Sequence, residues 1–270
     1  MSQATLVEKL KSGIRLDDEL VIDDHGHLGP WYNFHIVGGG TAATMIANMD
    51  LMGVDMVVFA PHISIGPDMK EGNRQAAEAA QQYPDRLVPY ITINPRYPLA
   101  EIEAEIACYH DELGGIKGFK FHSSCHAVDC SHVGYGPAYE YANEHGLPIL
   151  SHVWDGPEKD GKSFLTRQAA AYPKIAFLHA HSGNGWEAIK RLIPETKANP
   201  NVYLDLAGSG RPYGGLEYMV REAGADRILF GSDLPFIDIR CQLPRILAAR
   251  ISDDDKRLIM GLNAKRLFNL

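Results

Sequence analysis

The sequence is poor in cysteine and has no long apolar run. Four cysteines among 270 residues are too few for a disulfide scaffold, so we expect a reducing compartment and a cytoplasmic protein. No apolar stretch is long enough to span a membrane. The segment Met1–Leu20 mixes charged and aliphatic side chains, so we expect no signal peptide.

Positive charge is also scarce. The 26 Lys and Arg residues are outnumbered by 34 Asp and Glu residues, and the formal net charge is −8. Because nucleic acids and anionic membranes attract basic surfaces, we expect neither of them as a partner. The hydrophobic content of 45% is ordinary for a globular protein with a substantial core.

Apolar, strand-like segments alternate with helical segments along the whole chain. The expected strands are Leu20–His27, Asp55–Ala60, Arg86–Ile93, Ile116–His122, Leu147–Val153, Lys174–His181, Val202–Leu206 and Arg227–Asp233. The expected helices include Thr41–Met52, Asp68–Tyr83, Leu99–Leu113, Gly136–His145, Ser163–Ala171, Trp186–Lys197, Gly215–Ala223, Gln242–Ala249 and Asp253–Phe268.

This alternation predicts an α/β fold with a parallel sheet. Eight units over this length favour a closed (β/α)₈ TIM barrel over an open, doubly wound sheet. No Gly-X-Gly-X-X-Gly follows the first strand, which weakens the alternative of a dinucleotide-binding fold. Because no linker or low-complexity tract interrupts the pattern, we expect one domain over residues 1–270.

The carboxyl ends of these strands, where the active site of such a barrel lies, carry histidines and an aspartate. His25 and His27 are two residues apart on one strand, so both imidazoles point to the same side. Later strands end in Lys120, His122, His152, His179, His181 and Asp233. Converging imidazoles and a carboxylate predict a site for zinc or another divalent transition metal. Such an ion would lower the pKa of a bound water toward ~7.

Six motifs follow one another along nearly the whole chain. They are Asp23–His27, Gly118–His122, Leu147–His152, His181–Gly183, Gly231–Pro235 and Ile259–Phe268. In this order they resemble the amidohydrolase superfamily, specifically its amidohydrolase-related branch. That branch is associated with hydrolases, lactonases and decarboxylases of the aminocarboxymuconate-semialdehyde decarboxylase type.

The resemblance implies roles for individual residues. The implied metal ligands are His25, His27, His152 and Asp233. Zinc is the first expectation for the ion, with manganese or another divalent transition metal as alternatives. Asp233 would also accept a proton from the bound water, and His181 would stabilise charge on the substrate or shuttle a proton.

Further residues are expected to contact the substrate: Lys120, His122, Trp154 and Arg211. Lys120 has three alternatives. It is a carboxylated lysine that bridges two metals, with His181 on the second, or a free cation that binds a substrate carboxylate, or the partner of a barrel carboxylate such as Asp23. The alternative for His122 and Trp154 is that each side chain only packs against its neighbours and does not contact substrate. His179 is expected to pack more deeply than His181.

These residues predict a metal-dependent hydrolase of a small, carboxylate-bearing ester, lactone or amide. The alternative is a non-redox decarboxylase, which needs the same metal ligands, and a third is a non-catalytic metal- or ligand-binding protein. We expect one metal rather than two, and a homo-oligomer. The segment Cys125–His132 is rich in Cys, His and Asp, but its spacing matches no zinc motif that we know.

Overall fold

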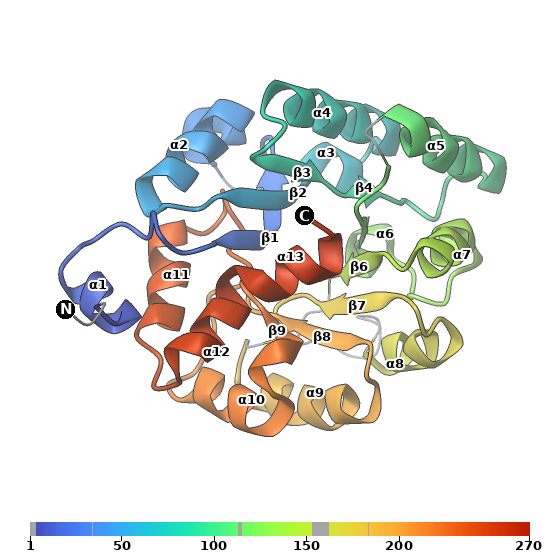
Figure 1. Cartoon of the computed structure of the whole chain (residues 1–270). Coiled ribbons are helices and arrows are strands. Elements are labelled where there is room, and N and C mark those ends of the chain that lie inside the picture. Colours follow the sequence, from blue (N-terminus) through green and yellow to red (C-terminus); the bar gives the residue numbers. More distant parts are fainter. Residues whose placement is uncertain (1–3, 34, 113–114, 153–161, 183) are drawn as a thin grey trace.

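The computed structural model describes residues 4–33, 35–112, 115–152, 162–182 and 184–270, and its strands form a parallel (β/α)₈ barrel. The strands are β1 (Ile22–Leu28), β2 (Met56–Pro61), β3 (Leu87–Pro89), β4 (Ile91–Thr92), β5 (Phe119–Phe121), β6 (Pro148–Ser151), β7 (Ala176–His179), β8 (Val202–Asp205) and β9 (Ile228–Leu229). Figure 1 shows them as a ring with the helices around it.

Neighbouring strands pair in chain order, from β1 to β3 and from β4 to β9. β3 and β4 are two parts of one barrel strand, separated by Tyr90, whose backbone N–H still bonds to β2 at 2.8 Å. The ring closes between β9 and β1, where the N–H of Asp24 donates to the carbonyl oxygen of Phe230 at 2.9 Å and Gly26 pairs with Leu234. The eight-stranded barrel predicted from the sequence is therefore confirmed.

Helices cover the outside of the barrel. They are α1 (Leu6–Lys11), α2 (Ala42–Met52), α3 (His62–Ile65), α4 (Met69–Gln82), α5 (Leu99–Glu112), α6 (Ser123–His126), α7 (Gly136–His145), α8 (Lys162–Ala171), α9 (Trp186–Ala198), α10 (Gly215–Ala223), α11 (Ile239–Leu247), α12 (Asp253–Arg257) and α13 (Asn263–Phe268). Caps define several boundaries: Thr41 accepts from the N–H of Thr44 at the start of α2, and left-handed Gly146 ends α7. In the described part of the chain, no helix is long and apolar enough to cross a membrane.

Apolar side chains fill the space between the strands and the helices. One buried cluster includes Met45 of α2, Leu192 of α9 and Leu243 of α11, and another lies under α5 and α7. In Figure 1 the closing helices α12 and α13, drawn in red, cross in front of the strands. There Phe268 packs edge-on against Tyr90, with ring centroids 5.7 Å apart. The polar strand ends described below therefore rest on a packed apolar scaffold.

Several boundaries differ from the prediction; for example, the predicted strand Lys174–His181 ends at His179, and His181 has a left-handed backbone (φ 60°). The last strand was predicted to continue to Asp233 but ends at Leu229, and Asp233 has a left-handed backbone (φ 64°), which a strand cannot contain. The predicted helix Asp253–Phe268 is interrupted by a π-helical turn, Leu258–Leu262. Within this turn the backbone of Gly261 approaches Leu20 so closely that a Cβ would lie 2.5 Å from the Leu20 carbonyl oxygen.

Candidate metal centre and substrate cavity

Two histidines of β1 and one aspartate after β9 meet at the carboxyl end of the barrel. Nε2 of His25 and Nε2 of His27 lie 3.4 and 3.5 Å from the same atom, Oδ1 of Asp233. All three side chains are buried. The structure therefore brings together three of the four ligands predicted from the sequence, and their binding of an ion remains a prediction.

Hydrogen bonds on the other side of each imidazole determine which nitrogen faces Asp233. His25 Nδ1 lies 2.8 Å from Asp205 Oδ2, and His27 Nδ1 lies 3.1 Å from the carbonyl oxygen of Ala60. An ionised carboxylate and a carbonyl only accept, so both rings carry their proton on Nδ1. Nε2 of each ring keeps a lone pair, as metal ligation requires.

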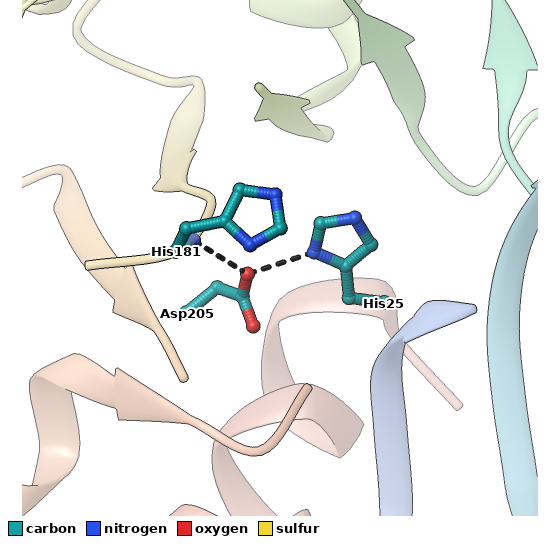
Figure 2. Close-up of side chains that lie close together, drawn as sticks. All are labelled: His25, His181 and Asp205. Atoms are coloured by element: carbon teal, nitrogen blue, oxygen red, sulfur yellow. Dashed lines mark hydrogen bonds and ion pairs between the residues drawn. The ribbon is translucent and has the colours of Figure 1, made fainter. Parts of the chain in front are cut away.

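Asp205, at the end of β8, was not predicted from the sequence. Figure 2 shows its carboxylate between His25 and His181, with Oδ2 accepting from His25 Nδ1 and from the backbone N–H of His181 at 3.2 Å. Oδ1 accepts from the N–H of Ala207 at 2.8 Å. Because Oδ2 already accepts two hydrogen bonds, we interpret Asp205 as the group that orients His25 and not as a ligand. The sequence did contain a signal for Asp205, because a carboxylate at the last position of a buried strand is unusual and indicates a specific partner.

The spacing of the first three side chains suits a divalent ion. Ligand atoms about 2.0–2.2 Å from a tetrahedrally coordinated ion lie roughly 3.3–3.6 Å from one another. The two separations from Asp233 Oδ1, 3.4 and 3.5 Å, fall in this range. Two imidazoles and a carboxylate are a donor set for zinc and for other divalent transition metals.

The protonation states also suit a metal. Burial lowers the pKa of His25 and of His27, which keeps both rings neutral at pH 7. Burial by itself would raise the pKa of Asp233, but the adjacent His181 keeps that pKa well below its usual value. Neutral imidazoles and an ionised carboxylate are the forms that bind metal ions.

Lys120 of β5 lies at the edge of this cluster. Its Nζ is 2.8 Å from His25 Nε2, and burial lowers the pKa of Lys120 to about 8, although Asp233 favours the charged form. Asp23, one of its predicted partners, instead accepts hydrogen bonds from the backbone N–H groups of His25 and Ser232, at 3.0 and 2.9 Å. The Asp23 carboxylate is thus engaged with the turn after β9, and the carboxylates that favour a charged Lys120 are Asp233, Asp205 and Asp24. The pairing of Lys120 with a barrel carboxylate stays a prediction.

His181 and His152 lie beside the cluster. His181 Nδ1 is 3.4 Å from Asp233 Oδ2, and His181 Nε2 is 3.2 Å from His152 Nδ1. The close group formed by His25, His27 and Asp233 does not include His152, whose role as a fourth ligand remains a prediction. Both His181 (φ 60°) and Asp233 have left-handed backbones, which are uncommon for such residues and cluster at functional sites.

A cavity of about 450 Å³ opens over the cluster, and its walls include the predicted substrate contact His122. A larger cavity of about 900 Å³ shares three wall residues with it, Trp31, Tyr32 and His62. Trp31 packs on His62 with ring centroids 5.1 Å apart, so the wall that the two cavities share is aromatic.

Arg211 and Trp154 were also predicted to contact the substrate. Nε and Nη2 of Arg211 are buried and have no hydrogen-bond partner among the described residues, and burial together with Arg245 lowers the pKa of Arg211 to about 10. Trp154 falls outside the described residues.

The segment Cys125–His132 does not form a metal site in the described part of the chain. His126 Nδ1 lies 3.2 Å from the hydroxyl of Tyr135, and Cys130 Sγ lies 3.2 Å from the hydroxyl of Ser123. Two groups of side chains have the spacing of metal ligands, and neither contains a residue of this segment: His25, His27 and Asp233, and His25, His181 and Asp205. The possibility left open by its composition is therefore not supported.

The sequence model of the family described as Amidohydrolase matches residues 22–270. The chain belongs to the amidohydrolase family. No curated protein matches this sequence.

Solved structures of similar fold cover most of this amidohydrolase. A 5-carboxyvanillate decarboxylase from Novosphingobium aromaticivorans, complexed with manganese and 4-hydroxy-3-methoxy-5-nitrobenzoic acid, is 18% identical, with a TM-score of 0.74 over 94% of this chain and 97% of its own. A 2,6-dihydroxybenzoate decarboxylase from Rhizobium is 20% identical (TM-score 0.69; 93% and 99%). A probable 2-pyrone-4,6-dicarboxylic acid hydrolase from Acinetobacter baumannii is 16% identical (TM-score 0.69; 93% and 99%). Because the sequence identities are 20% or lower, these similarities show a shared fold and not a shared activity.

Proposed function

We propose that this amidohydrolase is a metal-dependent hydrolase of a small, carboxylate-bearing ester, lactone or amide. The observation that supports the proposal is the orientation of the Asp233 carboxylate. Its Oδ1 faces Nε2 of both His25 and His27, whereas its Oδ2 faces His181 at 3.4 Å. One oxygen can therefore join a metal shell while the other accepts a proton.

Each residue then has a defined task. His25, His27 and Asp233 would hold the ion, with His152 as the predicted fourth ligand. When bound, a divalent ion lowers the pKa of a water and polarises a substrate carbonyl. Asp233 Oδ2 accepts the proton that the attacking water loses, and His181 stabilises charge that develops on the substrate oxygen.

Two cations, the buried Lys120 and the half-buried Arg211, support a substrate with a carboxylate. The guanidinium of Arg211 is poor in partners, and a buried charge without a counterion is unfavourable. Lys120 lies at the metal cluster, where it would meet a carboxylate near the reacting bond. In the alternative that we predicted from the sequence, Lys120 is carboxylated and bridges two ions, but we favour one ion.

The second candidate is a non-redox decarboxylase that uses the same shell. Several proteins of similar fold are named as decarboxylases, which favours this candidate. Among them are the 5-carboxyvanillate and 2,6-dihydroxybenzoate decarboxylases. Zinc remains our first expectation for the ion, and manganese, named in one of these complexes, is the alternative. We also expect a homo-oligomer, because related enzymes are often dimers whose subunits complete each other's sites.

A substrate panel separates these functions. Protein of measured metal content is incubated with 2-pyrone-4,6-dicarboxylate, and with 5-carboxyvanillate and 2,6-dihydroxybenzoate. Ring opening of the pyrone without release of CO₂ supports the hydrolase, whereas release of CO₂ from either benzoate supports the decarboxylase. A fully metal-loaded protein that turns over none of them, nor any of a wider set of esters, lactones and acids, would favour the non-catalytic alternative. Asp233→Asn should abolish turnover, and Asp55→Asn, at the opposite end of the barrel, should not.

A further inference from the structure

His122 and Cys125 form a pair between the two cavities. His122 follows β5 and lines the 450 Å³ cavity over the metal cluster, and Cys125, in α6, is exposed and lines the 900 Å³ cavity. His122 Nε2 lies 3.7 Å from Cys125 Sγ. The His122 ring also stacks on His152, with centroids 3.9 Å apart and planes at 12°. Its orientation is therefore held from two sides.

The hydrogen bonds of the His122 ring determine its tautomer. Nδ1 lies 3.3 Å from the backbone nitrogen of Cys125, because His122 is the N-cap residue of α6. A backbone N–H only donates, so Nδ1 must be the unprotonated nitrogen. An imidazole with an unprotonated Nδ1 carries its one proton on Nε2.

This is the reverse of the arrangement in the candidate metal ligands. His25 and His27 donate from Nδ1 and keep a lone pair on Nε2, whereas His122 accepts at Nδ1 and presents an N–H at Nε2. A protonated nitrogen cannot ligate a metal, so this tautomer excludes His122 as a ligand through Nε2. What it offers the cavity is a hydrogen-bond donor.

We propose that the Nε2–H of His122 binds an oxygen of the substrate carboxylate, and that Cys125 Sγ is the acceptor that this donor uses when no substrate is bound. A thiol sulfur is a weak acceptor, so a charged oxygen replaces it readily. The carboxylate in this inference rests on the proposed function, but the tautomer does not. Cys125 thereby satisfies the Nε2–H donor until the substrate replaces it.

The tautomer is measured directly by long-range ¹H–¹⁵N NMR of zinc-loaded protein labelled on histidine. We expect a protonated Nε2 and an unprotonated Nδ1 for His122, and the opposite pattern for His25 and His27. The spectrum of His122→Asn assigns the His122 signals. A His122 ring protonated on Nδ1 overturns the inference whether or not any substrate is turned over.

Recognition is tested with 2,6-dihydroxybenzoate as the probe, added to the same protein. Binding should shift the His122 Nε2–H signal. His122→Asn keeps an acceptor for the cap of α6 but cannot reach as far as Nε2, whereas His122→Gln places an amide N–H near that position. We expect about 10- to 100-fold weaker binding in His122→Asn, the scale for a lost hydrogen bond to a charged group, and a smaller loss in His122→Gln.

Variants of the thiol test the second half of the inference. Cys125→Ser places a stronger acceptor beside Nε2–H and should weaken probe binding several-fold, whereas Cys125→Ala removes the competing acceptor and should not. Equal probe affinity in wild type and His122→Asn overturns the inference and leaves the proposed function intact. Failure of the probe and of every other carboxylate in the panel to bind wild-type protein overturns both, since no carboxylate would then be recognised.

Discussion

Replacing Asp205 by Asn tests whether a residue outside the metal cluster determines metal affinity. The carboxylate accepts three hydrogen bonds, from His25 Nδ1 at 2.8 Å, from the N–H of His181 at 3.2 Å and from the N–H of Ala207 at 2.8 Å. An asparagine replaces one of the two oxygens by an NH₂ group. Whichever way the amide lies, a donor then faces a donor.

The consequence for His25 follows from its tautomer. If the amide nitrogen replaces Oδ2, His25 can pair with it only by accepting at Nδ1, which moves the ring proton to Nε2 and removes the metal-facing lone pair. Loss of such an orienting carboxylate typically weakens metal binding 10- to 100-fold. At about 1.4 kcal/mol per factor of ten, this corresponds to roughly 1.4–2.8 kcal/mol.

The assay is a competition titration with a chromophoric zinc chelator at pH 7, with circular dichroism to verify the fold. Asp55→Asn is the matched control, because Asp55 also accepts a backbone N–H, from Val21 at 2.8 Å, but lies at the opposite end of β1 and β2. We expect the control to bind zinc like wild type. A folded Asp205→Asn protein with wild-type zinc affinity would refute the assignment of Asp205 as the group that orients His25.

Four further outcomes are expected. His25→Ala should purify with little metal while keeping its fold, and full metal occupancy would contradict its assignment as a ligand. His181→Asn should lower kcat roughly 10²- to 10³-fold with metal content unchanged, whereas Asp233→Asn should lose both metal and turnover; loss of metal from His181→Asn would instead make His181 a ligand. Elemental analysis should give one metal per chain, and a ratio near two with a carboxylated Lys120 would show a binuclear site. Because burial lowers the pKa of His179 to about 3, the unfolded chain binds a proton below pH 6.5 that the folded state does not. The free energy of unfolding should therefore fall by about 2 kcal/mol between pH 7 and pH 5 through this residue, and urea titrations of metal-free His179→Leu should show a pH slope that is smaller by this amount.

The sequence by itself determined the barrel and the place of its chemistry. Strands buried on both faces read as continuous apolar runs, as in Asp55–Ala60, and amphipathic helices follow them, so the order of elements is a local property of the chain. In a barrel the strand ends share one face, so residues such as His25, His27 and Asp233 could be assigned to one site before any distance was known.

Only the tertiary structure decided how each imidazole is used. His25 and Asp205 are 180 positions apart, and no local pattern reports that their side chains are 2.8 Å apart. The same holds for His122, whose tautomer depends on the short helix α6, which the strand pattern did not predict. A residue type determines which hydrogen bonds are possible, but the proton on a histidine goes to the nitrogen whose neighbour accepts it, and that neighbour is supplied by folding.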